Sequence, residues 1–370
     1  QIRNGPGGLN DSEKLSWLQL VRTPRVGPVT FFRLLNRFGT ATAALDALPS
    51  LGSKDLGRHI PRREEIEREW EETHRFGATF LFAHQQTFPV LLKQNDPPPP
   101  VLTVCGRTQV FEKRCVAIVG ARQASAVGRK IAHEMAADLS QQGYAIASGL
   151  ARGVDGEAHT ASLEGGTIAV LGGGIDHIYP PQHKRLYEAI RESGVLVSES
   201  PLFYRATAKD FPRRNRIITG LSEGVVIIEA AERSGSLISA RTALEQNRDV
   251  MSVPASPLEP RAAGSNRLLK EGAILVRHAD DVIEALDRPI SHRMSAPEPP
   301  NYEAETDHDN QFPRSQIEAV KEVLSVTPTS IDEIARAANM GPARCASVLV
   351  ELELLGIART YAGGLASLAV

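Results

Sequence analysis

The sequence is poor in the features that mark secreted, membrane-spanning and disulfide-stabilised proteins. It has only three cysteines, whose positions form neither a CxxC motif nor a metal-ligand spacing. We therefore expect no disulfide framework and a protein of the reducing cytoplasm. No apolar run approaches the roughly 18 residues that a membrane span needs. A signal peptide is not expected either, although a chain that starts at Gln1 rather than at Met leaves room for a missing leader.

Motifs of common catalytic centres are also missing. The chain has no GxSxG, no HExxH and no Walker A lysine, and no arrangement of His, Cys and Ser indicates a nucleophile with its base. A net charge of −2 excludes a globally basic nucleic-acid coat but not a local basic site. With 370 residues, of which 42% are hydrophobic and 23% charged, the chain is expected to form two or three globular domains.

The front and the middle of the chain differ in their apolar periodicity. Residues 10–80 carry apolar side chains at helical spacing and predict a helical domain. Residues 81–288 predict a second domain, in which short apolar runs alternate with helical stretches. The runs are VAIVG, YAIAS, TIAVLG, VLVSE, GVVIIEA, VMSVP and AILV. Continuous apolar strands separated by helices indicate an α/β fold, a doubly wound parallel sheet covered on both faces.

The end of the chain predicts a linker and a third, smaller domain. Residues 289–313 are rich in proline, acid and amide, which is typical of a flexible linker. Residues 314–370 combine three helical segments with a hairpin, the pattern of a winged-helix domain. Its expected recognition helix carries Arg344 against Glu351 and Glu353, which is poor chemistry for a DNA major groove. We therefore favour a protein–protein or regulatory role for this domain.

Candidate binding residues follow the strands, because ligands of doubly wound sheets bind at the carboxyl ends of the strands. Arg122 stands just beyond VAIVG, and Gly149 and Gly153 bracket Arg152 after YAIAS. A glycine-flanked loop that runs into a helix is expected to present free backbone N–H groups to an anion. Three glycines after TIAVL predict either a close backbone approach, which we favour, or a flexible turn.

Two later segments offer the same kind of helix start. Ser234, Gly235 and Ser236 open a helix after GVVIIEA, and Ser265 and Asn266 repeat the pattern in GSN. Small hydroxyl groups and backbone N–H groups at a helix start form an anion cradle. Several such starts are expected to converge on one edge of the sheet, which suits a polyphosphate backbone better than a single phosphate.

The segment FPRRNRIITGL crowds three arginines against an apolar stripe. Pro212 suits the first position of a helix, so that Arg213, Arg214 and Arg216 oppose the helix macrodipole. Such a broken local rule favours a functional anion site over an incidental basic face. At about 100° per residue, Arg214 shares the buried face and is expected to overhang the cleft, whereas Arg216 points nearly opposite. Replacing Arg214 or Arg216 by alanine is expected to have little effect on the stability of the fold.

Asp155 and His159 lie one helical turn apart, as metal ligands do, but no third ligand accompanies them. We favour a capping role for Asp155 and a packing or hydrogen-bonding role for His159. No metal and no other cofactor is expected.

Seven segments resemble, in order and spacing, the signature segments of the DNA-processing protein A (DprA/Smf) family. They are VAIVGARQAS, ASGLARGVDGEAH, LGGGIDHIYPPQH, FPRRNRIITGLS, SGSLISARTALEQ, VPASP and GSNRLLKEGA. The resemblance covers roughly residues 88–276 and implies a Rossmann-like sheet domain. The flanking parts look like the family's N-terminal helical domain, of the SAM or helix-hairpin-helix kind, and its C-terminal winged-helix domain.

The resemblance also implies a function. A member of this family binds single-stranded DNA that enters the cell in natural transformation, protects it and loads the RecA recombinase onto it. It forms a homodimer through the Rossmann-like domain, involves no membrane and has no established catalytic activity. Carried onto this sequence, the DNA-binding residues are Arg122, Gly149, Arg152, Arg213, Arg214, Asn215, Arg216, Ser234, Gly235 and Ser236. Ala255 departs from the family, which usually has Gly there.

The front segment TPRVGPVTFFRLLNRFG resembles half of a helix-hairpin-helix. Residues 17–45 carry four arginines and no acid, which favours non-specific contact with phosphates. Arg25, however, stands where that motif usually has its first Gly.

An enzyme is the alternative hypothesis. The sheet also resembles nucleotide-processing phosphoribohydrolases, in which a PGGxGTxxE segment supplies a catalytic Glu. The corresponding stretch here is ERSGSLIS, which places Ser239 at the position of that Glu and argues against hydrolysis. A purely structural scaffold, the third hypothesis, leaves the arginines unexplained.

Overall fold

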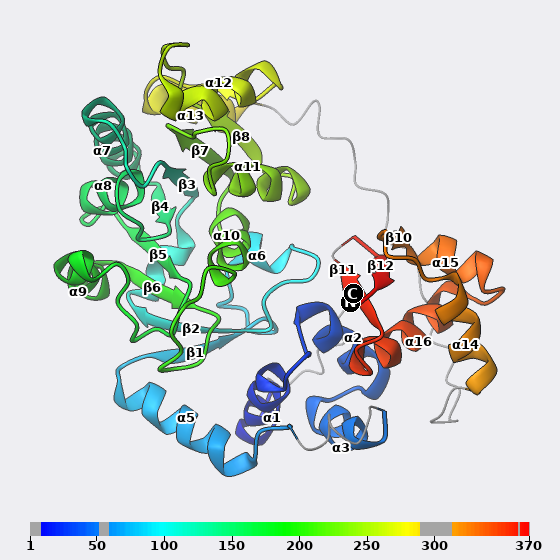
Figure 1. Ribbon diagram of the computed structural model, residues 1–370. Coiled ribbons are helices and arrows are strands. Elements are labelled where there is room, and N and C mark those ends of the chain that lie inside the picture. Colours follow the sequence, from blue (N-terminus) through cyan, green and yellow to red (C-terminus); the bar gives the residue numbers. More distant parts are fainter. Residues whose placement is uncertain (1–8, 52–58, 289–312, 362, 370) are drawn as a thin grey trace. The chain divides into compact units, whose positions relative to one another are not determined.

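The computed structural model describes residues 9–51, 59–288, 313–361 and 363–369 (Figure 1). Its internal contacts divide the chain into two units. One unit comprises Gln1–Arg68, Asp96–Pro100 and Ile290–Val370, and the other comprises Glu69–Asn95 and Val101–Pro289. The helical front and the tail of the chain therefore share one unit, and the sheet is the centre of the other.

Nine strands form one mixed sheet, in the order β1-β2-β6-β5-β4-β3-β7-β8-β9. The strands are β1 (Thr79–Phe82), β2 (Val101–Gly106), β3 (Cys115–Gly120), β4 (Ala145–Ser148), β5 (Thr167–Leu171), β6 (Val195–Ser198), β7 (Gly224–Ile228), β8 (Asp249–Ser252) and β9 (Ile274–Leu275). From β6 to β9 neighbouring strands are parallel. All seven predicted runs lie in this parallel part, whereas the antiparallel edge formed by β1 and β2 was not predicted.

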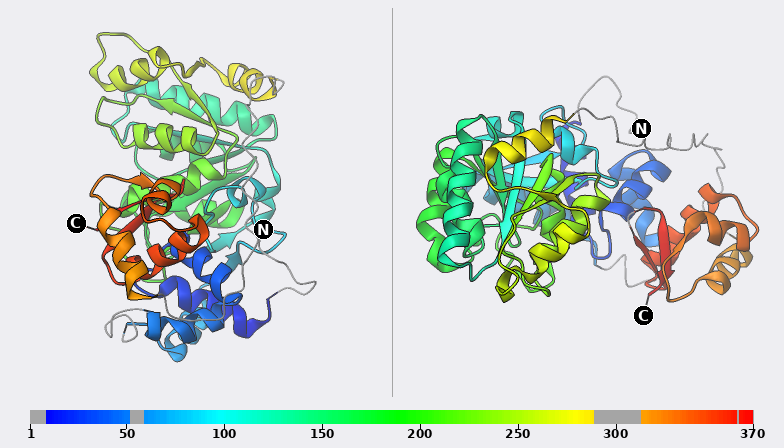
Figure 2. Two further views of the ribbon diagram at one scale, coloured as in Figure 1. Left: turned by 90° about the vertical axis from the view of Figure 1, so that its right-hand side faces the viewer. Right: turned by 90° about the horizontal axis from the view of Figure 1, so that it is seen from above.

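Helices cover both faces of this sheet, as the predicted doubly wound fold requires. Helices α7, α8 and α9 lie on one side and α10 and α11 on the other (Figures 1 and 2). The helices of this unit include α6 (Val90–Lys93), α7 (Ala126–Gln141), α8 (Val154–Ala161), α9 (Lys184–Ser193), α10 (Asp210–Gly220), α11 (Ser236–Glu245), α12 (Ala263–Lys270) and α13 (Ala279–Asp287). Burial from both sides explains why the strands are apolar without alternation. None of the described helices has the length and apolarity to cross a membrane.

The direction of winding reverses at β3. Strands β4, β5 and β6 extend the sheet from one side of β3, whereas β7, β8 and β9 extend it from the other. A sheet opens a ligand crevice at such a point, at the carboxyl ends of its strands. The last residue of β3 is Gly120. A side chain does not fit there, because a Cβ at this position would lie 1.9 Å from the carbonyl oxygen of Ile228 on β7.

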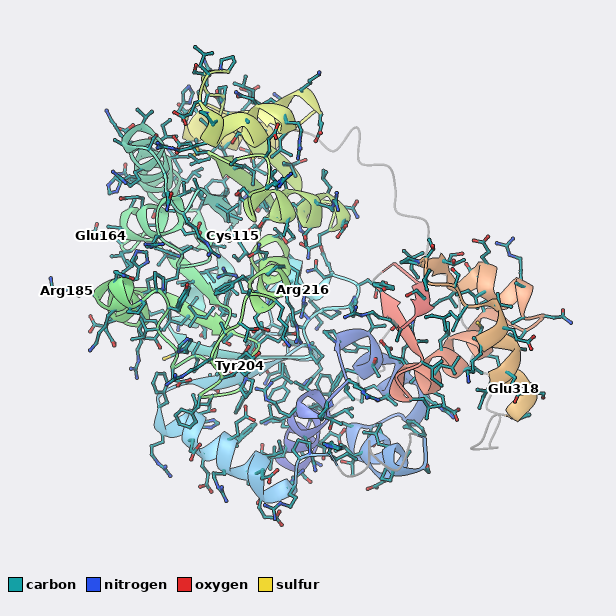
Figure 3. The ribbon with its side chains drawn as sticks, viewed as in Figure 1. Cys115, Glu164, Arg185, Tyr204, Arg216 and Glu318 are labelled. Carbon is teal, nitrogen blue, oxygen red and sulfur yellow. The ribbon has the colours of Figure 1, made fainter. Side chains whose placement is uncertain are left out.

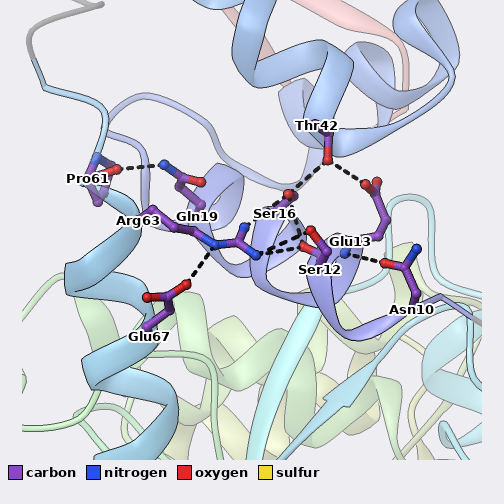
Figure 4. A network of polar contacts seen from close by, with 9 residues as sticks. All are labelled: Asn10, Ser12, Glu13, Ser16, Gln19, Thr42, Pro61, Arg63 and Glu67. Atoms are coloured by element: carbon purple, nitrogen blue, oxygen red, sulfur yellow. Dashed lines mark hydrogen bonds and ion pairs between the residues drawn. The ribbon is translucent and has the colours of Figure 1, made fainter.

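The front of the chain folds into a helical module held by polar contacts between its helices (Figure 4). Its helices are α1 (Asp11–Arg22), α2 (Pro28–Phe38) and α3 (Ala41–Leu51), and α5 (Arg63–Arg75) follows. Glu13 of α1 accepts hydrogen bonds from the N–H of Ala41, at 2.6 Å, and from the hydroxyl of Thr42, at 2.7 Å. Arg63 donates to the hydroxyl of Ser16 on α1 at 3.3 Å. These contacts tie α3 and α5 to α1.

The tail of the chain folds into the predicted winged helix. It contains α14 (Arg314–Val323), α15 (Ile331–Ala337), α16 (Pro342–Leu354) and a small sheet of β10 (Thr329–Ser330), β12 (Leu365–Leu368) and β11 (Ala358–Tyr361). The hydroxyl of Ser330 caps α15 by accepting from the N–H of Glu333 at 3.2 Å. The predicted linker, residues 289–313, lies outside the described residues except for Pro313. The α/β fold with a helical front and a winged-helix tail is confirmed.

Candidate nucleic-acid interface

A pocket lies at the carboxyl ends of β3, β4 and β5, beside the first turns of α10. The loops that follow these strands form most of its wall. Four of the predicted binding residues line the pocket, namely Arg122, Gly149, Arg152 and Arg214. The aromatic rings of Tyr179 and Phe211 line it as well. The predicted convergence of strand-end residues on one edge of the sheet is thus seen for these four.

Arg214 forms the buried wall of the pocket, and its guanidinium group is bonded to the protein's own backbone. Nη1 donates to the carbonyl oxygen of Gly149 at 2.7 Å and also to that of Val170. The side chain shares the buried face of α10, as predicted, but is only 7% exposed and does not overhang a cleft. The helix begins at Asp210 rather than at Pro212, so that the arginines lie deeper in it than expected.

Gly149 makes room for this guanidinium group. A Cβ at this position would lie 2.5 Å from Nη2 of Arg214. Real Cβ contacts are not that short, and both groups are buried, so that neither has space to move. The absence of a side chain at position 149 therefore serves the fold of the pocket rather than a close approach of the ligand.

Asp155 and His159, both on α8, hold the loop after β4 by accepting hydrogen bonds from its backbone. Oδ2 of Asp155 accepts from the N–H groups of Gly149, at 3.1 Å, and Ala151, at 3.4 Å. Nε2 of His159 accepts from the N–H of Leu150 at 3.3 Å. The prediction that the loop presents free backbone N–H groups to an anion is therefore wrong for Gly149, Leu150 and Ala151. The favoured hydrogen-bonding role of His159 is confirmed, whereas Asp155 holds the loop and Gly153 occupies the N-cap of α8.

Burial sets the protonation of this cluster. It raises the pKa of Asp155, although the charge of Arg214 opposes this effect. It lowers the pKa of Arg214 to about 10, so that the guanidinium group stays charged at neutral pH. Burial, with His183 and Arg214 nearby, lowers the pKa of His159 to about 3. A neutral imidazole that accepts at Nε2 must carry its proton on Nδ1, which then donates to the hydroxyl of Thr167 at 2.7 Å.

Arg122 and Arg152 are the exposed cations of the pocket, and aromatic rings accompany them. The guanidinium carbon of Arg122 lies 5.3 Å from the centroid of the Phe211 ring. The rings of Phe211 and Tyr179 have centroids 5.6 Å apart, and Tyr179 is 48% exposed. Sequence reasoning missed both rings. Both could have been found from the sequence, because Tyr179 follows a strand in IYPP and Phe211 stands directly before the arginines in FPRRNR.

The three glycines after β5 allow two segments of the protein to approach each other. A Cβ at Gly173 would lie 2.8 Å from the carbonyl oxygen of Tyr204, and one at Gly174 would lie 2.5 Å from that of Pro201. The predicted close backbone approach is confirmed, but the partner is the protein's own later loop.

Apart from Phe211 and Arg214, the residues of the FPRRNR segment do not line the pocket. Nε of Arg213 lies 3.4 Å from the Glu199 carboxylate, and Arg216 (labelled in Figure 3) pairs with the same carboxylate. Oδ1 of Asn215 accepts from Nε of Arg214 at 3.2 Å. One acid thus partly neutralises two of the three arginines.

The last predicted cradle is occupied by internal hydrogen bonds. Oγ of Ser265 accepts from the N–H of Ala230 at 2.7 Å. The amide of Asn266 bonds both the N–H and the carbonyl of Ala255, at 3.1 and 3.0 Å. These side chains tie the segments after β7 and β8 to α12, so that Ser265 and Asn266 hold loops in place.

The cradle at the start of α11 lies outside the pocket wall. The hydroxyl groups of Ser234 and Ser236 are 2.6 Å apart, and Gly235 between them is exposed. Within the described part of the chain, no group of three His, Cys, Asp or Glu side chains is placed to hold a metal ion.

Comparison with known proteins agrees with this geometry. A family model described as DNA recombination-mediator protein A matches residues 79–287, more than half of the chain. The chain belongs to the DprA/Smf family. Models of the DprA-like N-terminal HHH domain and the DprA winged helix domain match residues 11–71 and 298–364.

Individual DprA/Smf proteins are similar over most of the chain. Protein Smf of Escherichia coli is 39% identical over 286 residues, which cover 76% of this chain and 75% of that protein. Protein Smf of Synechocystis is 32% identical over 94% of this chain and 96% of its own. Among solved structures, DprA from Streptococcus pneumoniae has a TM-score of 0.64 at 27% identity, covering 73% of this chain and 97% of that one.

A second solved structure, DprA from Helicobacter pylori, was described for its single-stranded DNA binding mode. It has a TM-score of 0.51 at 29% identity and covers 56% of this chain and 98% of that one.

Replacing Arg214 is expected to destabilise the fold, which corrects the expectation from the sequence that its loss has little effect on stability. Arg214→Ala leaves the carbonyls of Gly149 and Val170 without their donor and the buried Asp155 without its counter-charge, which costs about 3 kcal/mol or more. Arg216→Ala, which removes one of the two arginines that pair with Glu199, is the matched control and should cost less, because Arg213 still pairs with that carboxylate. Urea unfolding of both variants measures the difference, and equal losses would contradict the role given to Arg214.

Acid is expected to destabilise the protein partly through His159. Its pKa is about 3 in the folded chain and ordinarily 6.5, so that the unfolded chain binds more protons between these values. The stabilisation is complete above pH 6.5 and falls with pH toward 3, by up to about 1.4 kcal/mol per unit. His159→Gln should flatten the pH dependence of the free energy of unfolding, and the exposed His133→Gln should not. An unchanged slope in His159→Gln would show that the imidazole is not held neutral.

Proposed function

We propose that this DprA/Smf protein binds single-stranded DNA, without sequence preference, in the pocket at the carboxyl ends of β3, β4 and β5. The observation that carries the proposal is the combination of the exposed cations Arg122 and Arg152 with the rings of Tyr179 and Phe211. Guanidinium groups neutralise phosphates, and aromatic rings stack on unpaired bases of any kind. A duplex keeps its base faces stacked inside, so the rings favour a single strand.

The predicted binding residues take different parts in this proposal. Arg122 and Arg152 contact the strand, whereas Gly149 and Arg214 give the pocket its shape. Residues outside the pocket contact DNA only where the strand extends beyond it. These outer residues are Arg213, Asn215, Arg216, Ser234, Gly235 and Ser236, and Ser265 and Asn266 support their surroundings.

We further propose that the strand is DNA taken up in natural transformation, which the protein protects and onto which it loads RecA. The family, one of recombination mediators, supports this role. Three cysteines that are free and buried fit the reducing cytoplasm as the place of action. Homodimerisation through the Rossmann-like domain has a candidate surface at β9, an edge strand of two residues on which Leu275 is 51% exposed.

A catalytic role is not part of the proposal. Ser239, which stands where the phosphoribohydrolase-like proteins have their Glu, is buried in α11 and carries no carboxylate. The acid next to the pocket, Asp155, is buried and bonded to backbone N–H groups.

Removing the exposed ring is expected to weaken single-strand binding selectively. Tyr179→Ala should lower the affinity for a single-stranded oligonucleotide by roughly 5- to 150-fold, the worth of one base–aromatic stack of about 1–3 kcal/mol. Tyr179→Phe keeps the ring and should bind like the parent. Phe203→Ala removes a ring that is 67% exposed and does not line the pocket, and is the matched control.

Fluorescence anisotropy at several salt concentrations, with single-stranded and duplex oligonucleotides, measures these affinities. The parent should bind the single strand more tightly, with a slope of log affinity against log salt of about 0.7 per phosphate neutralised. Tighter binding of the duplex, or equal losses in Tyr179→Ala and Phe203→Ala, would contradict the proposal.

A further inference from the structure

Helices α2 and α16 lie together within one unit of the chain, and their facing side chains carry opposite charge. The hydroxyl of Thr30 on α2 donates to Oε2 of Glu353 on α16 at 2.8 Å. One and two turns further along α2 stand Arg33 and Arg37, in the stretch of the sequence that carries four arginines and no acid. The basic face predicted to contact phosphates is thus in contact with the winged-helix module.

Acids of α16 act electrostatically on Arg33 and Arg37. Burial lowers the pKa of Arg33, and the Glu353 carboxylate opposes this effect. Burial also lowers the pKa of Arg37, which Glu351 opposes. Burial raises the pKa of Glu351 in turn, and Arg37 acts against it. Opposite charges therefore act on each other across the contact between α2 and α16.

A third arginine packs beside these pairs. Arg25 has a φ of 67°, in the left-handed region that favours glycine, which fits the loop position where the helix-hairpin-helix motif usually has Gly. A Cβ at Gly356, in the turn after α16, would lie 3.0 Å from Nη1 of Arg25. The turn after α16 thus lies against Arg25, which stays exposed, beside the contact that partly buries Arg33 and Arg37.

The acids stand in an unfavourable place for α16 itself. Glu351 and Glu353 lie in its last turn, where the helix macrodipole disfavours carboxylates. Glu353 is held in position by the N–H and hydroxyl of Thr360 on β11, at 3.2 and 2.7 Å. The two carboxylates break a local rule of helix stability, and the arginines of α2 are what offsets it.

The contact leaves some of its charged atoms unsatisfied. Nη1 of Arg33 and Oε2 of Glu351 are both buried without a hydrogen bond. A buried polar atom that lacks its partner weakens the contact that buries it. A phosphate group at this place would give Nη1 of Arg33 an acceptor, and a guanidinium group binds phosphate in bidentate geometry.

We propose that the basic surface formed by Arg33 and Arg37 of α2 and by Arg25 of the loop before it is a binding surface for the phosphates of duplex DNA, and that α16 covers its α2 part through Glu351 and Glu353. A duplex holds its phosphates in a fixed array, which suits cations fixed on a rigid helix and requires no base to be exposed. The two carboxylates occupy the positions of phosphates until a duplex displaces them. This surface is separate from the single-strand pocket and goes beyond the function proposed for that pocket.

Neutralising the two acids in the full chain tests the proposal. Glu351→Gln/Glu353→Gln should raise the affinity for a duplex oligonucleotide about fivefold or more, with a steeper salt dependence, since it uncovers phosphate contacts. Single-strand binding should stay within twofold of the parent at the same salt, so that the test does not depend on the pocket. The control Glu318→Gln/Glu322→Gln changes the net charge equally at two exposed acids of α14 (Figure 3) and should leave duplex binding unchanged.

Adding Arg33→Ala/Arg37→Ala to the glutamine variant should return duplex affinity to that of the parent. An unchanged duplex affinity in a glutamine variant that melts like the parent would overturn the proposal. An equal rise in the α14 control, or a rise that the two alanines do not reverse, would overturn it as well. If the double glutamine variant fails to fold, Glu353→Gln alone, which removes one carboxylate charge and keeps an amide oxygen that can accept from Thr30, must show a smaller rise of the same kind.

Discussion

A buried guanidinium group at the carboxyl edge of the sheet gives the pocket its shape, and the proposed function depends on that shape. Arg214 joins the ends of β4 and β5 by donating to Gly149 and Val170, and Asp155 supplies the opposite charge. A charge stays buried in this way only when its acceptors and counter-ion are in place. These bonds fix the loop after β4 before any ligand binds. Arg122 and Arg152 therefore stand on an ordered backbone, and the protein loses little conformational entropy on binding.

The sheet and the region of the pocket could be predicted from the sequence, because both follow from local pattern. Runs such as VAIVG and YAIAS are apolar throughout, as strands buried on both faces must be. Their carboxyl ends meet at one edge of the sheet, which brings Arg122, Gly149 and Arg152 together. Strands β1 and β2 were not predicted, because they pair antiparallel at the edge of the sheet and the proline run 97–100 directly precedes β2.

The partners of polar side chains could not be predicted in the same way, because they come from distant parts of the chain. Arg216 meets Glu199, 17 residues away, and Asn266 meets the backbone of Ala255. The FPRRNR arginines therefore take two parts: Arg214 is buried and bonded to backbone carbonyls, whereas Arg213 and Arg216 pair with Glu199. Tyr179 and Phe211 share the pocket wall although 32 positions (211 − 179) separate them in the sequence. The same holds for the tail. The sequence indicates that Glu351 and Glu353 are unsuited to DNA, but it does not indicate that they lie close to arginines of α2.

Photochemical cross-linking of a single strand to the full chain tests the central claim most directly. An oligonucleotide with a photoreactive base at each position in turn is irradiated in the complex, and the adduct is located by mass spectrometry of the peptides. The account predicts adducts at the pocket rings, Tyr179 and Phe211, whichever base carries the photoreactive group, since stacking does not depend on sequence. Adducts confined to the winged-helix module, or to the start of α11 at Ser234 and Ser236, would contradict it.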